Sequence, residues 1–521
     1  MHQHLLRLLN LVFFICIPAL LWSSSLSLEV EQALEEAGEN RVELEKALAH
    51  FDQSEDSLKL EAACFLIGNM EGHSYVTFAL RDSNDVEIDL NVLDFEDFKA
   101  LINHCDTLEQ EHGEIDFEKK ETIPDLETIT ADFLIEHIDY AFKAWEEKPW
   151  AKDLTFDQFC NYVLPYRGSS EPLEPWRKYF WEKYKDISKQ VDDPTDPVQI
   201  AAAINNDIMS WFRFDSRYYL HPTDQGFQEM LDGNLGRCED MTNLTIFAMR
   251  ANGLAVVSDY TPYWANIGNN HAWNAIVKPD GEVIPFMGAE ANPGKYRLSY
   301  KMGKTYRKMY AKQPRNLTFQ ERKQEDLPRW LAGKSYTDVT ADYTEISDVV
   351  IAFSKEIPDT VDLAYLCVFN TGEWKPIEWG WVKSNKSLFT DMGVDVAYLP
   401  GLYLNKEIVP YSPPFILTED KQVKMLLPEA DKTQTIVLTS TTKRIQDLST
   451  EGMQVTHLKE GTEYTLSYWQ DGWMEIGKQT AGDEPLTFEN VPAGGLYWLI
   501  PDDGGEEERI FTIEDGVQVW W

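Results

Sequence analysis

A cysteine and a histidine, each placed at the start of an expected secondary-structure element, constrain this chain more than any other feature. Cys238 follows Gly236 and precedes a run with apolar residues at helical spacing, which Gly253 ends, so a helix is expected to begin at the cysteine. His271 opens a stretch in which apolar and polar residues alternate, which predicts a strand. One helix, one short strand and one loop separate the two residues, and this order can bring the imidazole beside the thiol.

A second strand is expected after the histidine strand. The turn signal at residues 279–281 precedes it, and it runs over residues 282–286.

A thiol beside an imidazole suits nucleophilic catalysis, because the imidazole can accept the thiol proton and later protonate the leaving group. The helix N-terminus favours a thiolate. We therefore expect a Cys238 pKa below the ordinary value of about 8.5.

The order Gly-x-Cys, helix, strand, loop, His-Ala-Trp and strand resembles the transglutaminase-like superfamily over roughly residues 156–316. The chain is similar in particular to large secreted Bacteroidetes proteins with a transglutaminase domain. The resemblance implies a papain-type α+β core in which Cys238 is the nucleophile and His271 the base. The family usually carries an Asp after the histidine strand, but residues 283–288 contain no carboxylate. Glu290 is the preferred third catalytic member, and Asn292 is the alternative.

Trp264 lies on the loop before His271 and is a candidate for lining a substrate channel; the alternative is that it simply covers the core. No cofactor is expected. No spacing of cysteine, histidine or carboxylate residues is typical of a metal site.

The length and charge of the chain limit its architecture and its partners. A chain of 521 residues predicts several domains, and a formal net charge of -41 makes nucleic acid an improbable partner. The fold class predicted is multi-domain α+β. It comprises a helical N-terminal region over residues 28–149, the transglutaminase-like core over 150–325, a β-sandwich over 326–429, and a second sandwich of jelly-roll or discoidin-like type over 430–521.

The N-terminus predicts export. Residues 1–27 contain a basic residue, an apolar run and a small-residue stretch, which is typical of a secretory signal peptide. We expect a secreted, periplasmic or cell-surface protein whose mature chain has no transmembrane helix. Cys16 lies in the apolar run, and the remaining five cysteines leave one free thiol in an oxidising compartment, for which Cys238 is the candidate.

Two further stretches have an ordinary structural interpretation and a functional one. Residues 300–310 are locally basic and are expected to form a solvated helix face rather than a phosphate site. The expected sandwiches are rich in tryptophan, which favours core packing over stacking on sugar or peptide; the residues are Trp374, Trp379, Trp381, Trp469 and Trp473.

The resemblance implies a cysteine enzyme that acts on amide bonds of a peptide or protein through a thioester, and by analogy of fold it favours a hydrolase or deamidase over a cross-linker. The alternative is a catalytically inactive envelope protein that binds peptide or glycan. The absent Asp favours this alternative, and the retained Cys238 and His271 oppose it.

Overall fold

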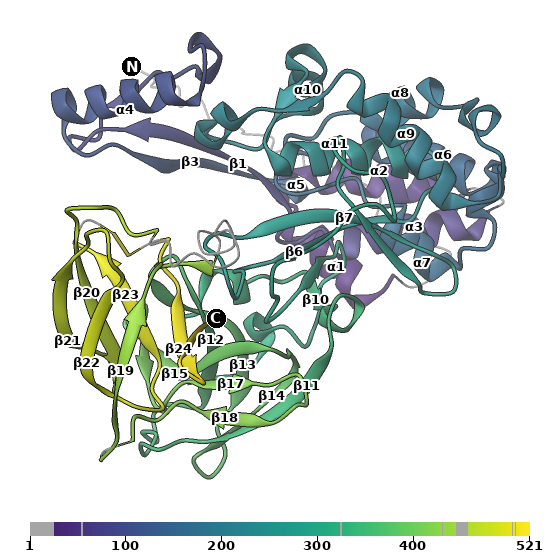
Figure 1. The fold of residues 1–521 in the computed structure, drawn as a ribbon. Coiled ribbons are helices and arrows are strands. Elements are labelled where there is room, and N and C mark those ends of the chain that lie inside the picture. Colours follow the sequence, from purple (N-terminus) through teal and green to yellow (C-terminus); the bar gives the residue numbers. More distant parts are fainter. Residues whose placement is uncertain are drawn as a thin grey trace, which may run out of the picture.

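The chain folds into a helical half that contains the cysteine helix and a β-rich C-terminal half (Figure 1). The computed structural model describes residues 26–53, 56–323, 326–429, 431–443, 457–502, 504–505 and 507–521. Residues 1–25 of the expected signal segment, including Cys16, lie outside the described residues. Within the described part, no helix combines the length and the apolar character needed to span a membrane.

The N-terminal region contains the expected helices and a sheet that the sequence analysis missed. Four helices pack together over buried alanine and leucine side chains; they are α1 (Leu28–Glu36), α2 (Arg41–Asp52), α3 (Ser57–Gly68) and α6 (Ala131–Glu147). Between α3 and α6, the strands β1 (Ser74–Arg81), β2 (Glu87–Ile88) and β3 (Asp116–Pro124) form an antiparallel sheet beside α4 (Phe98–His112). This unit projects from the helical body in Figure 1. The charged residues of β3 are largely exposed, so this strand lacks the apolar alternation that reveals a half-buried strand.

The core consists of one helix packed on a five-stranded antiparallel sheet. The helix is α11 (Cys238–Arg250), and the strand order is β10-β9-β6-β7-β8. The strands are β6 (Val256–Thr261), β7 (His271–Val277), β8 (Val283–Phe286), β9 (Tyr306–Lys308) and β10 (Tyr336–Asp338). All six residues of β6 are buried, because α11 covers one face of the sheet and the first β-sandwich packs against the other. The helix, the two strands around His271 and Gly253, with its φ of 74°, confirm the expected order.

Three further helices surround α11. They are α8 (Trp176–Lys183), α9 (Pro197–Met209) and α10 (Phe227–Gly233). As a result, every residue of α11 from Asp240 to Arg250 is buried, and the helix has no solvent-exposed face.

The expectation of a solvated helix at residues 300–310 was wrong. Residues 306–308 form β9, which pairs with β6 and β10, and the side chain of Lys304 is fully buried. Arg307 is also buried and pairs with Asp259 of β6 at 2.7 Å. The cations of this stretch have carboxylate partners on other elements of the fold, which a single stretch of sequence cannot show.

The C-terminal half contains two modules of facing antiparallel sheets. In the first, β11 (Ile346–Ala352) pairs with β14 (Lys386–Gly393) and faces a larger sheet. That sheet contains β12 (Leu363–Asn370), β13 (Glu373–Trp381), β15 (Val396–Leu404), β16 (Glu407–Pro410), β17 (Phe415–Leu417) and β18 (Val423–Met425). Thus the first of the two sandwich modules is built from sheets of very different size.

The second module repeats this arrangement. The pair β19 (Thr433–Leu438) and β22 (Leu486–Pro492) faces a five-stranded sheet. The sheet has the order β21 (Trp473–Thr480), β20 (Glu463–Trp469), β23 (Tyr497–Pro501), β24 (Ile510–Glu514) and β25 (Val517–Trp520). Trp374 and Trp469 are buried, as expected for core packing, whereas Trp379, Trp381 and Trp473 are half-buried.

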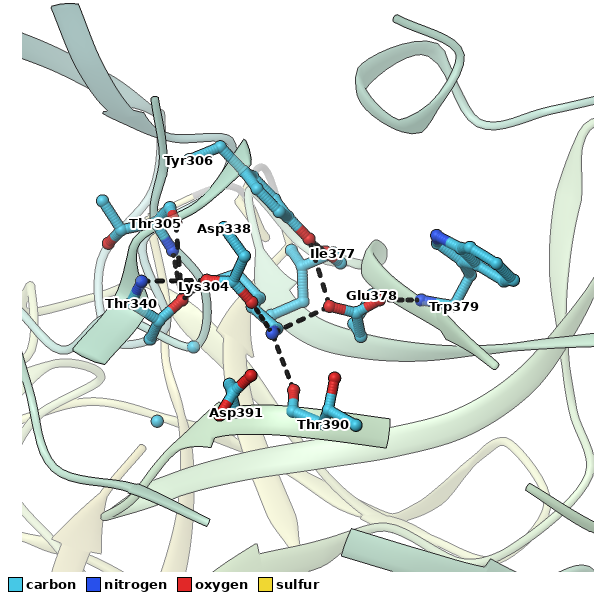
Figure 2. A network of polar contacts seen from close by, with 12 residues as sticks. Lys304, Thr305, Tyr306, Asp338, Thr340, Ile377, Glu378, Trp379, Thr390 and Asp391 are labelled. Atoms are coloured by element: carbon cyan, nitrogen blue, oxygen red, sulfur yellow. Dashed lines mark hydrogen bonds and ion pairs between the residues drawn. The ribbon is translucent and has the colours of Figure 1, made fainter. Parts of the chain in front are cut away.

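A buried lysine joins the core sheet to the first sandwich (Figure 2). Lys304 Nζ forms ion pairs with Asp338 of β10 and, at 2.8 Å, with Glu378 of β13, and it donates a hydrogen bond of 2.7 Å to the Thr390 carbonyl of β14. Burial raises the pKa of Glu378, and Lys304 opposes this shift. The domain boundary expected at residue 325 stays a prediction. Strand β10, which follows residue 325 in sequence, belongs to the core sheet.

Candidate active site

The thiol stands at the first residue of α11, in a turn held by polar contacts. Asp240 accepts a hydrogen bond of 2.9 Å from the backbone N–H of Arg237, and the Arg237 guanidinium donates one of 2.7 Å to Asp224. A Cβ at Gly236 would lie 2.6 Å from the Asp240 Cβ, so glycine is required for this close approach. These contacts fix the helix start and with it the position of Cys238.

The expectation of a low pKa for Cys238 was wrong. Burial and the neighbouring Glu239 carboxylate raise the pKa of the thiol to about 11, while Arg237 opposes them only in part. Lys308 forms an ion pair with Glu239, but the carboxylate stays next to the sulfur in sequence and space. The unbound site therefore holds a neutral thiol at physiological pH.

His271 begins β7, and Nε2 of its ring lies 2.5 Å from the hydroxyl oxygen of Tyr296, at hydrogen-bond distance. Nδ1 has no hydrogen-bond partner within the described residues, and no hydrogen bond there joins the ring to Cys238. Burial lowers the pKa of the imidazole below its ordinary value. A neutral imidazole thus has one nitrogen oriented by Tyr296 and the other available.

Tyr296 is the site residue that the sequence analysis missed. Burial raises its pKa, and the Glu290 carboxylate and the ionised form of Cys238 raise it further, so the phenol stays protonated at physiological pH. It lies near Glu290, Cys238 and His271. It follows the turn at residues 292–295, where no strand or helix periodicity marks it. Tyr296 is far from His271 in sequence, and the two residues come into contact only because of the path that the chain takes after β8.

The two expected third members lie on the loop after β8, and neither forms a hydrogen bond with His271 within the described residues. The Glu290 side chain is exposed and acts on Tyr296 through its charge. Asn292 instead accepts a hydrogen bond of 3.1 Å from Asn205 and donates one of 2.8 Å to Asn206 of α9. In this arrangement Glu290 can influence the imidazole through Tyr296, while Asn292 anchors the loop to α9.

Trp264 lies against the histidine. Its ring is buried and stacks on His271 with centroids 6.0 Å apart, and it lies 6.3 Å from Trp273. Asn370 of the first sandwich donates a hydrogen bond of 2.9 Å to the Trp264 carbonyl. Trp264 thus forms one wall beside His271, and the sandwich holds the loop that carries it.

A comparison with protein families identifies the segment that carries these residues. The family model of the transglutaminase-like superfamily matches residues 185–286, which include Cys238 and His271 but end before Glu290 and Tyr296. No curated protein matches the chain.

Among solved structures, the chain is similar to the crystal structure of red sea bream transglutaminase. The identity is 9% and the TM-score 0.19, over 90% of this chain and 79% of that one. That likeness is too weak to support an argument. The family match and the geometry together show that the chain contains a transglutaminase-like core over residues 185–286.

Proposed function

We propose that the protein is a cysteine enzyme that acts on amide bonds of a peptide or protein, with Cys238 as nucleophile and His271 as general base. The observation that carries the proposal is the link through Tyr296. This residue is hydrogen-bonded to His271, and its pKa responds to Cys238, so the three groups occupy one site inside or directly after the family-matched segment.

The protonation states favour general-base catalysis over a preformed ion pair. The thiol is neutral because its pKa is about 11, and the imidazole is neutral because burial lowers its pKa. When His271 Nε2–H donates to the Tyr296 oxygen, Nδ1 carries the lone pair that accepts the thiol proton. Sulfur then bonds to the carbonyl carbon, and the negative charge that develops on the carbonyl oxygen faces the N–H groups at the start of α11.

The second half of the reaction releases the amine and resolves the thioester. The imidazolium returns its proton to the departing nitrogen, the C–N bond breaks, and an acyl-thioester remains on Cys238. Water then attacks the thioester carbonyl, His271 accepts the water proton, and the carboxylic acid leaves as the thiol is restored. We favour hydrolysis or deamidation over transfer to an amine, because the intermediate exposure of Cys238 leaves the thioester accessible to water.

The test is product analysis on a glutamine-containing peptide library, with and without a primary amine. Mass spectrometry distinguishes cleavage, deamidation and an amine adduct. The expected result is cleaved or deamidated peptide that Cys238→Ala and His271→Ala both abolish. If the wild-type chain forms no Cys238-dependent product, while the same library still binds it, the inactive peptide-binding alternative replaces this proposal.

We also propose that the protein is exported, which rests on the apolar segment before residue 27. Cleavage between Ser27 and Leu28 would retain every residue of α1 and remove only the Ser27 hydroxyl that caps it. Intact-mass measurement of the native protein is expected to place the mature N-terminus near Leu28 without a lipid. A mass that includes a diacylated Cys16 would contradict this.

A further inference from the structure

A cavity lies beside the C-terminal part of the cysteine helix, away from Cys238. It encloses about 440 Å³ between the C-terminal part of α11, strands β6 and β9, and the loop around Gly168. Ile246 and Arg250 line it from the helix, and Ser258 and Lys308 line it from the sheet. Cys238, His271 and Tyr296 are not among its lining residues.

The cavity wall is cationic, although the chain as a whole has a formal charge of -41. Four cationic side chains line it, and no Asp or Glu does so within the described residues; the four are Arg167, Arg250, Lys308 and Lys334. Three of these cations have carboxylate partners outside the cavity wall, since Arg167 pairs with Asp125, Lys308 with Glu239, and Lys334 with Glu71.

Arg250 is the exception. Its side chain is buried, and its Nε and Nη1 donate to the backbone carbonyls of Val256, Pro165 and Arg167. No carboxylate lies within ion-pair distance among the described residues, and Nη2 has no hydrogen-bond partner there. The nearby carboxylate of Glu171 accepts the N–H groups of Gly168 and Ser169 at 2.8 and 2.7 Å. The guanidinium therefore has no carboxylate in direct contact, and the charge of Glu171 offsets only part of the burial that lowers the Arg250 pKa to about 9.

A buried hydroxyl in the same wall also lacks a partner. Ser258 is 2% exposed, and its Oγ forms no hydrogen bond within the described residues. Because Asp259 pairs with Arg307 in the antiparallel register of β6 and β9, Ser258 lies opposite Lys308. Lys308 in turn lies 3.3 Å from the Ser169 hydroxyl of the loop that Arg250 contacts. The donors of Arg250, Ser258 and Lys308 thus come from three elements around one cavity.

We propose that this cavity binds an oxyanion of the phosphate class. A buried guanidinium without a carboxylate partner and a hydroxyl donor without an acceptor both gain from an anionic oxygen. The lysines supply further positive charge, and the volume suffices for inorganic phosphate or a small phosphate monoester. Binding does not require the chemistry of Cys238.

The test is calorimetric titration of the full-length chain with inorganic phosphate and, separately, glycerol phosphate, with sodium chloride at matched ionic strength as reference. We expect saturable binding of at least one of the two, which the Cys238→Ala chain retains. The better ligand identifies the source as free phosphate or an organic monoester. Ser258→Ala is expected to weaken binding by about ten- to a hundredfold, the effect of one hydrogen bond to a charged group. Its ligand-free thermal midpoint should equal or exceed that of the wild type, because an unpartnered hydroxyl is removed.

Ser387→Ala is the matched control. Ser387 is also 2% exposed, and its hydroxyl also lacks a partner within the described residues, but it lines a separate cavity between the core sheet and the first sandwich. Its substitution should leave phosphate affinity unchanged. Arg250→Gln should abolish binding, and if that variant does not fold, Ser258→Ala and Lys334→Gln decide the result. Titration heats no larger than those of chloride, or equal affinity in the wild type and Ser258→Ala, would overturn the proposal.

Discussion

Replacing Tyr296 by phenylalanine tests whether the Tyr296 hydroxyl orients the His271 imidazole or instead blocks its Nε2 from acting as a base. The substitution retains the ring and removes only the hydroxyl that lies 2.5 Å from Nε2. In the proposed reaction, Nε2–H donates to that oxygen while the imidazole becomes positively charged. A hydrogen bond to a charged group contributes about 1.5–3 kcal/mol. Because each 1.36 kcal/mol corresponds to about tenfold in rate, we expect acylation to slow by about ten- to a hundredfold.

The assay is acylation of Cys238 by a p-nitrophenyl ester, followed by the burst of nitrophenolate, since this reaction requires no knowledge of the natural substrate. Tyr219→Phe is the matched control. The pKa of Tyr219 also responds to Cys238, but its hydroxyl forms no hydrogen bond with His271 within the described residues. The control variant should acylate at the wild-type rate.

The pH profile separates an orienting role from a merely structural one. Burial already lowers the pKa of His271, so the acid limb of the acylation profile should lie below about pH 6.5. Tyr296→Phe removes an acceptor for the imidazolium, which lowers the pKa further and moves that limb to lower pH. Acylation of Tyr296→Phe at or above the wild-type rate would refute the orienting role, because a phenol that blocks Nε2 would release the base when removed.

Three other predictions test the site and the fold. Alkylation of Cys238 by iodoacetamide should rise about tenfold per pH unit from about pH 7 to 10, because the thiol pKa is about 11; a plateau at neutral pH would contradict the neutral thiol. Glu290→Gln should slow acylation modestly, because the charge of Glu290 acts on Tyr296. Asn292→Ala should leave the acylation rate unchanged and lower the free energy of unfolding, measured with urea, by about 1 kcal/mol. If Asn292→Ala slows acylation more than Glu290→Gln does, the orienting role belongs to Asn292. Lys304→Met should lower the free energy of unfolding by about 3–5 kcal/mol at pH 8, because two carboxylates lose their buried cation. That loss should shrink at pH 5, because burial raises the pKa of Glu378 and this carboxyl therefore binds a proton more tightly in the folded chain. An equal loss at both pH values would contradict the network.

Local patterns predicted the elements that carry Cys238 and His271. The helical spacing after Cys238, the alternation after His271 and the glycine at residue 253 are properties of neighbouring residues, and the structure confirms the elements that they predict. For the basic stretch at residues 300–310, local patterns gave a wrong prediction of a solvated helix. Lys304 and Arg307 are buried beside Asp338 and Asp259, which lie tens of residues away in sequence. A charged side chain can therefore be expected on the surface only if no oppositely charged residue from a distant part of the sequence pairs with it.

The third member of the site could not be derived from spacing for a similar reason. Glu290 and Asn292 are close to the position at which the family usually carries an Asp, but the left-handed conformation of Ala289 and the hydrogen bonds of Asn205 direct that loop toward α9. The chain then returns and places Tyr296 on the imidazole. A tyrosine in a loop carries no periodic signal, so only the folded path of residues 287–296 identifies it.

The pKa of the thiol shows why position on a helix does not by itself determine reactivity. The helix start and Arg237 favour the thiolate, but burial and Glu239 outweigh them and raise the pKa to about 11. The buried imidazole cannot offset this as a cation, because its own pKa is lowered. In the proposed reaction, proton transfer from Cys238 to His271 is therefore unfavourable until sulfur begins to bond to a carbonyl carbon, when the acidity of the S–H group rises. A site of this kind protects the resting thiol from oxidation and alkylation, and it ties nucleophile activation to a correctly placed acyl substrate.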